Sequence, residues 1–472
     1  MKEPLSPSRL VEKLRSFQVD ELHPGVLFAL FYLKWALDVR DANATPVGVA
    51  LNVPPTPWAS LSEGSPAEMG ERVLKLFEQL EARNPSLFGT MADLVGNAEH
   101  AMRRSPRAVT ALIYAVDQLG RVNLFPEDAG SAEEVSRSYR QLAEHFFNSR
   151  AVDQSAPSAM LCRLLVELAQ PQGGDIVFDP WASWGETLRY ALQYQKEVGE
   201  DDAYDAGIFG LTHNSMMLRI AKMLADVSRQ SQPDIRFGLP NFQFDEELDE
   251  LREGVDFVIS APQLGAPFSV QDLEHLEPGR RPSILGASES RAIHFALDLI
   301  HEHGAVLLAM PPFVLNRGQQ LAEQRRMLLQ RDLVDSVILL PLGATARHSI
   351  QTAILVLRKE KRADRQGKVF FITVPESSVR SRRLSSLEQG AFREVVESYQ
   401  RYETVDDFAT SVDVQTLLEN EADLNPSRYT VDLRTEPANI AEIRRAIVEA
   451  EQARDRATGA LNAVLNRLNG KA

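Results

Sequence analysis

The chain has 472 residues, of which 44% are hydrophobic and 25% are charged, and this length predicts roughly two or three domains with substantial cores. With 51 basic residues against 66 acidic ones, the net charge of −15 argues against a protein that coats nucleic acid by charge alone. A single cysteine, Cys162, excludes an intramolecular disulfide framework and a Cys-x-x-Cys zinc site, and it fits a reducing compartment.

The longest apolar run covers residues 25–37 and is interrupted by Lys34. It is shorter than the ~20 residues that a membrane span needs. Acidic residues, Asp20 and Glu21, precede it, whereas a signal peptide would have a basic segment there. We therefore expect a soluble cytoplasmic protein of bacterial type that does not enter a membrane. The neighbouring histidines of residues 294–303 lack metal-ligand spacing, so no metal site is expected.

Residues 1–150 have the pattern of a helical domain. Apolar residues recur at three- and four-residue steps, as in Val73, Leu76, Phe77 and Leu80. Residues 43–66 contain five prolines and little periodicity, which predicts a loop across the surface. A strand-rich region is not expected before residue 150.

A different pattern begins after residue 150, where short apolar runs alternate with helical segments. Such alternation is typical of an α/β domain with a mostly parallel sheet that is buried on both faces. We predict this domain over residues 151–375, with a sheet of seven to eight strands. The expected strands are residues 175–179, 206–211, 234–237, 255–260, 305–310, 336–340 and 352–357, with an eighth at 368–374.

In an open sheet of this kind, ligands bind outside the carboxyl ends of the strands. The loops that follow Phe178 and Ile259 are therefore the places where chemistry is expected.

Residues 376–472 are predicted to be helical again. Apolar residues continue at helical spacing from Ile440 to Leu468, which predicts a long terminal helix. This helix either packs on its own domain or serves as a partner-binding arm. Upstream, residues 358–383 hold nine basic residues against Glu360, Asp364 and Glu376. The stretch is either a solvated loop or the part of this acidic chain that touches phosphate.

Several short strings fall in a characteristic order along the chain. Residues 177–180 are Val-Phe-Asp-Pro and are followed by Gly185, residues 354–357 are Ile-Leu-Val-Leu, and residues 425–429 are Asn-Pro-Ser-Arg-Tyr. In this order the chain resembles the modification (methylation) subunit of type I restriction enzymes, which are S-adenosylmethionine-dependent DNA adenine methyltransferases. The resemblance covers nearly the whole chain and implies a Rossmann-like methyltransferase domain between an N-terminal helical domain and a C-terminal helical tail.

The resemblance also implies a particular chemistry. Methyl transfer to the exocyclic amine of adenine is an in-line displacement that needs neither a metal nor a dedicated nucleophile. Catalysis depends on holding the donor and the flipped base in line and on acceptors for the hydrogens of the amine. The family uses a glycine-rich loop after the first strand, an acidic residue after the second, and an Asn/Asp-Pro-Pro-aromatic motif after the fourth.

The positions that resemble the family's cofactor site are degenerate. Asp179, Pro180, Ser183 and Gly185 occupy the cofactor loop, in which only Gly185 remains of the family's three glycines. Glycine is needed in such a loop for close backbone approach and for unusual dihedral angles. Thr212 stands where the family has the acid that binds the ribose hydroxyls, and a single hydroxyl accepts fewer hydrogen bonds than a carboxylate.

The position that resembles the catalytic motif is degenerate as well. The chain reads Ala261, Pro262, Gln263 and Leu264 where the family has Asn-Pro-Pro-aromatic. Ala261 has no side-chain acceptor and Leu264 has no aromatic face. The loss of one preorganised polar contact costs roughly 3 kcal/mol of transition-state stabilisation. Gln263 is the only residue here whose side chain could replace the acceptor.

Three hypotheses follow for the function. The leading one is a non-catalytic pseudo-methyltransferase with a scaffold role or a role in assembling a DNA complex, and it requires no cofactor. The alternative is an active adenine-specific DNA methyltransferase with divergent motifs, which binds S-adenosylmethionine. In the third, the pocket binds another small molecule or a nucleotide, on which Trp181 and Trp184 stack.

The resemblance also bears on partners. Family members work with a specificity subunit that docks through C-terminal helices. The expected partners are therefore a specificity-type subunit bound by the C-terminal helix, or a second copy of the chain in a homo-oligomer. DNA would be reached through such a complex or through residues 358–383.

Overall fold

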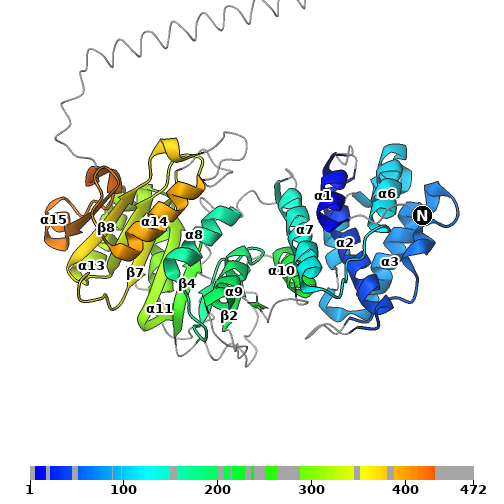
Figure 1. Ribbon diagram of the computed structural model, residues 1–472, viewed down its shortest axis with the longest axis horizontal. Helices are drawn as coiled ribbons and strands as arrows, with labels where there is room; N and C mark the ends of the chain where they lie inside the picture. Colours follow the sequence, from blue (N-terminus) through cyan, green and yellow to red (C-terminus); the bar gives the residue numbers. More distant parts are fainter. Residues whose placement is uncertain are drawn as a thin grey trace, which may run out of the picture.

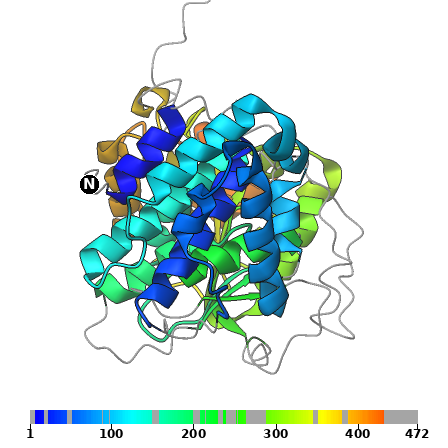
Figure 2. The same ribbon diagram turned by 90° about the vertical axis from the view of Figure 1, so that its right-hand side faces the viewer.

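The computed structural model describes residues 6–16, 22–44, 51–87, 89–96, 98–148, 157–198, 207–212, 215–228, 235–238, 251, 254–262, 288–344, 351–379 and 387–430. A helical lobe and an α/β lobe lie next to each other along the longest axis of the molecule (Figure 1). Viewed from the end of that axis, the helical lobe stands in front of the sheet (Figure 2).

The helical lobe is built around one apolar helix, α2 (Pro24–Asp41), whose residues are buried along nearly its whole length. The other helices bury an apolar face in the same hydrophobic core. In α6, Ser105 caps the N-terminus by accepting from the amide of Ala108, and Pro106 occupies the first turn. The remaining helices of this lobe are α1 (Pro7–Ser16), α3 (Met69–Arg83), α4 (Thr90–Val95), α5 (Ala98–Arg104), α6 (Pro106–Leu119) and α7 (Ala129–Asn148).

The α/β lobe contains a nine-stranded sheet in the order β3-β2-β1-β4-β5-β7-β6-β8-β9. The pairs of neighbouring strands are parallel except for β5 with β7, β6 with β7, and β8 with β9. The strands are β1 (Val177–Asp179), β2 (Ile208–Leu211), β3 (Arg236–Gly238), β4 (Val255–Ser260), β5 (Ile300–Met310), β6 (Val334–Leu339), β7 (Ala353–Arg358), β8 (Lys368–Thr373) and β9 (Ala409–Asp413). The predicted α/β class, the mostly parallel sheet and the eight predicted strands are confirmed.

Two apolar layers cover the sheet, as expected for strands that are buried on both faces. One layer packs α8 (Ala159–Ala169), α9 (Glu186–Val198) and α14 (Gln389–Arg401) on the sheet. The other packs α11 (Ser288–Leu299), α12 (Phe313–Asn316), α13 (Gln319–Gln330) and α15 (Val414–Glu419). The sheet is therefore the middle of three layers.

Helix α10 (Ser215–Ser228) follows β2 in the chain but packs on the helical lobe. Its apolar residues Ile220, Met223 and Val227 belong to the same hydrophobic core as α2 and α7. The figures show α10 beside α7 at the junction of the two lobes (Figure 1). A helix of the α/β unit thus completes the core of the helical lobe.

The region after residue 376 contains a strand that the sequence did not predict. Strand β9 pairs antiparallel with β8 and forms one edge of the sheet. The expectation of a wholly helical region after residue 376 is wrong at this point. The predicted long terminal helix lies outside the described residues. Among the helices that the structure does describe, none is long and apolar enough to cross a membrane.

Candidate functional site

The carboxyl ends of β1 and β4 meet at a buried polar contact. Asp179, the last residue of β1, is 1% exposed and accepts a hydrogen bond from Ser260 Oγ at 2.5 Å and from the Trp181 amide at 3.0 Å. Burial raises the pKa of Asp179 to about 7, although hydrogen bonds from Ser260, the Trp181 amide and Thr187 oppose the shift. Its carboxyl group faces the interior and holds the two strand ends together.

The loop between β1 and α9 turns sharply, with positive φ angles at Ser183 (50°) and Gly185 (87°). The side of Gly185 on which a Cβ atom would project is covered by the ring of Phe237 from β3. A Cβ atom there would lie only 2.4 Å from Phe237 Cζ. The same ring also approaches Gly210 of β2, where a Cβ would lie 3.2 Å from Phe237 Cδ1. The space beside Gly185 and Gly210 at the strand ends is therefore filled by the side chain of Phe237.

Two tryptophans of this loop are buried on opposite sides, each 6% exposed. Trp181 belongs to the core on the α11 side of the sheet and meets Phe295 edge-on, with ring centroids 6.1 Å apart. Trp184 belongs to the core of the helical lobe together with α10. The hypothesis that both rings stack on one bound ligand does not match this placement.

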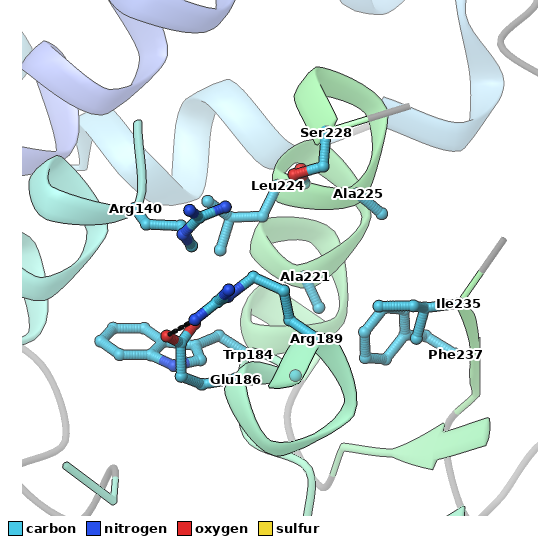
Figure 3. A pocket seen from close by; sticks show the side chains of 11 residues that line it. Arg140, Trp184, Glu186, Arg189, Ala221, Leu224, Ala225, Ser228, Ile235 and Phe237 are labelled. Atoms are coloured by element: carbon cyan, nitrogen blue, oxygen red, sulfur yellow. Dashed lines mark hydrogen bonds and ion pairs between the residues drawn. The ribbon is translucent and has the colours of Figure 1, made fainter. Parts of the chain in front are cut away.

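A charged cluster follows at the start of α9 (Figure 3). Glu186 accepts from Arg189 Nη2 at 2.7 Å and from Arg189 Nε at 3.2 Å, and both side chains are nearly buried. Burial opposes ionisation of Glu186, but Arg189, and to a smaller extent Arg140 of α7, hold its pKa below the ordinary value. The negative charge of the Glu186 carboxylate is therefore balanced by arginine side chains inside the protein.

A small cavity lies between this cluster and α10. Trp184, Gly185, Phe237 and Leu224 line it together with Arg140 (Figure 3). Its volume is about 30 Å³, which leaves room for only about two water molecules. A nucleoside does not fit into this space as it stands.

Most of the remaining predicted site residues that the structure describes are buried as well. Thr212, after β2, is 1% exposed, and Ala261, after β4, is 6% exposed. Pro180 and Pro262 are buried and Ser183 is half-buried. Gln263 and Leu264 lie outside the described residues. Strand pairing thus brings Asp179, Gly185, Thr212 and Ala261 together at the carboxyl ends of the strands, as predicted from their positions along the chain.

Much of the basic stretch at residues 358–383 takes part in internal contacts. Lys361 is 4% exposed and pairs with Asp332 at 2.5 Å. Arg365 is 5% exposed, pairs with Asp335 at 3.2 Å, and stacks on Tyr402 with its guanidinium 4.5 Å from the ring centroid. These cations stabilise the junction of β6, β8 and α14 and do not form a surface for phosphate.

No group of three or more His, Cys, Asp or Glu side chains that could hold a metal ion occurs within the described ranges. His301 Nε2 donates to Asp256 Oδ1, 2.7 Å away, at the opposite end of the strands from the carboxyl ends described above. Cys162 is fully buried, and its Sγ accepts from Thr187 Oγ1 at 3.4 Å. Burial raises the pKa of the Cys162 thiol well above its usual range, so this thiol is unreactive.

Comparison with known proteins identifies the family. A family model described as N-6 DNA methylase matches residues 133–437, which is more than half of the chain. The chain belongs to the N-6 DNA methylase family. The resemblance inferred from the order of the short strings is thereby confirmed.

Curated relatives of this N-6 DNA methylase family member include methylase subunits of type I restriction enzymes from Methanocaldococcus jannaschii. The MjaIX subunit is 22% identical over 432 residues, which are 86% of this chain and 70% of that protein. The MjaVII subunit is 23% identical over 300 residues, which are 60% of this chain. That match spans only about half (51%) of the length of the MjaVII subunit.

Solved structures agree on the fold. The methyltransferase subunit of a type I restriction-modification system from Streptococcus thermophilus superposes with a TM-score of 0.70 at 16% identity, covering 90% of this chain and 100% of the other. The modification subunit of a putative type I restriction enzyme from Vibrio vulnificus gives 0.62 at 15% identity, covering 91% and 98%. The two lobes described above are therefore a shared architecture.

The family donor, S-adenosylmethionine, can be tested against the residues at the strand ends. A nucleoside would need the space above Gly185 that Phe237 fills, and a polar group at Thr212 that is open to it. A negative charge, Glu186, stands at the start of α9 and is already paired. The described residues do not fit this cofactor.

Three residues that matter here were missed from the sequence: Phe237, Ser260 and Arg140. Phe237 and Ser260 look like ordinary strand residues, and Arg140 lies on a helix of the other lobe. A signal was present for Phe237, because a bulky ring at the end of the third strand is adjacent to the cofactor loop in a parallel sheet.

Proposed function

We propose that this chain is a non-catalytic member of the N-6 DNA methylase family, a pseudo-methyltransferase that serves as a scaffold in a DNA-modifying assembly. The observation that carries the proposal is the ring of Phe237 on the open side of Gly185. This glycine is the one retained from the family's cofactor loop, and its free side is used for packing within the protein.

The catalytic position supports the same proposal. Ala261 offers no side-chain acceptor for an amine hydrogen, and the side chain of the preceding Ser260 is bound to Asp179. An activated acceptor is normally preorganised at the reacting atoms, where it contributes most of the stabilisation of developing charge. Of the catalytic position, the structure describes Ala261 and Pro262, which are buried and have no polar side-chain atom.

The alternative function is an active adenine-specific DNA methyltransferase that binds S-adenosylmethionine. Two observations favour it: Asp179 and Gly185 are retained, and the family model matches the chain continuously across both motif positions. For this function, Phe237 and Trp184 would both have to leave their packed positions.

The scaffold role implies partners of the kind found among similar proteins. One similar chain, with a TM-score of 0.63 at 18% identity and 97% coverage of each chain, comes from a structure solved to explain complex assembly and conformational transition of a type I restriction-modification system. We propose that residues 376–472 bind a specificity-type subunit, with a homo-oligomer as the competing assembly. The complex as a whole, rather than the chain with its net charge of −15, would recognise DNA.

The proposal is tested by titrating the purified chain with S-adenosylmethionine in a calorimeter and by measuring transfer of a radiolabelled methyl group to adenine in duplex DNA. We expect no binding heat at millimolar donor, which is the deciding result because donor binding does not depend on DNA recognition by the complex, and no transfer above that of a heat-denatured sample. An active methylase subunit of a type I enzyme, run in parallel, is the positive control. Transfer of label to adenine by the purified chain would show the alternative function to be correct.

A further inference from the structure

The loop between β1 and α9 connects the two lobes. Trp184 from this loop is 6% exposed and belongs to the hydrophobic core of the helical lobe, together with residues of α2, α7 and α10. Trp181, three residues earlier, is equally exposed but belongs to the core on the other side of the sheet. The loop is thus anchored in both lobes, by Trp184 in the helical lobe and by Trp181 against the sheet.

Helix α10 extends the same junction. Asp226 of α10 accepts a hydrogen bond from Tyr32 OH of α2 at 2.8 Å, and the hydroxyls of Ser228 and Ser136 lie 2.7 Å apart. An ion pair joins Arg219 of α10 to Asp93 of α4. These polar contacts surround an apolar centre, so the junction resembles the interior of a domain more than a mobile interdomain surface.

Charge adds a second contact between the loop region and the helical lobe. Arg140 of α7 lines the small cavity with Trp184, Glu186 and Arg189 (Figure 3). Burial lowers the pKa of Arg140, the nearby Arg189 lowers it further, and the Glu186 carboxylate opposes both. Glu186 therefore interacts favourably with a cation from each lobe.

We propose that Trp184, together with α10, is a clamp that fixes the orientation of the helical lobe relative to the sheet. Large aromatic side chains bury ~150–250 Å² each and dominate interface energetics. Without the Trp184 ring, the apolar contact between the two lobes would be smaller and their relative orientation would vary more, because interfaces within a chain are mobile unless they are large and hydrophobic. The loop that resembles the family's cofactor loop thus has an architectural role here.

The clamp is tested by measuring the distance between spin labels on the two lobes. Both labelling positions are exposed: Lys75 on α3 and Lys368 on β8, each changed to cysteine. The native Cys162 is fully buried and is not labelled. In the otherwise unchanged protein we expect one narrow distance distribution. In Trp184→Ala we expect the width of the distribution to increase at least about twofold.

Trp181→Ala is the matched control, because it removes an equally buried ring of the same loop from the other core. We expect it to lower the melting temperature but to keep the narrow distribution. If Trp184→Ala does not fold by circular dichroism, Trp184→Phe replaces it and should broaden the distribution to a smaller extent.

A distribution in the folded Trp184 variant as narrow as in the parent, or equal broadening by the Trp181 variant, would overturn the clamp. The distances are measured without S-adenosylmethionine or DNA. A failure here is therefore distinguishable from a failure of the proposed non-catalytic function, which depends on methyl transfer.

Discussion

At the scale of single residues, Asp179 is a buried carboxyl group whose hydrogen-bond partners among the described residues are uncharged. Ser260, the Trp181 amide and Thr187 are its hydrogen-bond donors, and its pKa is raised to about 7, mainly by burial. A carboxyl group whose pKa is higher in the folded than in the unfolded protein makes the folded state bind its proton more tightly. Its contribution to stability is complete at low pH and falls as the pH rises from about 4 toward 7.

Asp179→Asn should remove this pH dependence. The amide oxygen can accept from Ser260 and from the Trp181 amide, and the group never ionises. We expect similar unfolding free energies for the two proteins at about pH 3, below both pKa values, and a more stable variant at about pH 8, by at most about 4 kcal/mol. Urea unfolding at both pH values measures the difference. Parallel pH profiles for the two proteins would show that Asp179 does not titrate between the two pH values.

At the scale of elements, the contact between the β1–α9 loop and β3 determines what the strand ends can hold. Gly185 has a φ of 87°, and a Cβ atom there would lie 2.4 Å from Phe237 Cζ. A side chain at this position therefore meets two separate obstacles, the backbone conformation and the neighbouring ring. The first belongs to the loop itself, and the second belongs to its contact with β3.

A double-mutant cycle separates the two obstacles. Gly185→Ala should destabilise the parent protein by about 3 kcal/mol, from backbone strain and overpacking together. In the Phe237→Ala background only the strain of about 1 kcal/mol should remain. The expected coupling of about 2 kcal/mol is measured by denaturant unfolding of the four proteins. Additive effects would mean that Phe237 does not fill the space beside Gly185.

The elements differ in how far the sequence predicts them. Eight strands were predictable because a strand buried on both faces is a short, continuous apolar run, such as Ile-Leu-Val-Leu at residues 354–357. Strand β9 is Ala-Thr-Ser-Val-Asp and lies at an edge of the sheet, so its residues carry no such run. Its structure depends on pairing with β8, which is a contact between distant segments.

The candidate site divides in the same way. The positions of Asp179, Gly185, Thr212 and Ala261 after their strands were predictable, because parallel strands end at one edge of the sheet. The parts played by residues 140 and 237 in filling the site were not predictable, because these residues reach the loop only through tertiary packing. The basic stretch shows the same limit: Lys361 and Arg365 read as surface charges, yet Asp332 and Asp335 bind them inside the protein.

At the scale of the whole molecule, the two lobes do not have independent cores. Helix α10 belongs to the α/β unit by its position between β2 and β3, but its apolar face completes the core of the helical lobe. If either lobe unfolds, the other loses part of its packing. A chain of this length would otherwise be expected to unfold domain by domain, because multidomain proteins depart from two-state behaviour.

We therefore expect one cooperative thermal transition for the full chain. Differential scanning calorimetry should give a single peak, with a calorimetric enthalpy equal to the van't Hoff enthalpy within about 10–15%. Ile220→Ala, which leaves a cavity in the α10 contact, should lower the melting temperature of this peak by several degrees, because deleting buried methyl groups costs about 2–5 kcal/mol. Lys222, on the same helix, is exposed, and Lys222→Ala serves as the matched control with little expected change. Two resolved peaks for the unmodified chain would mean that the lobes unfold separately and that α10 does not couple their stabilities.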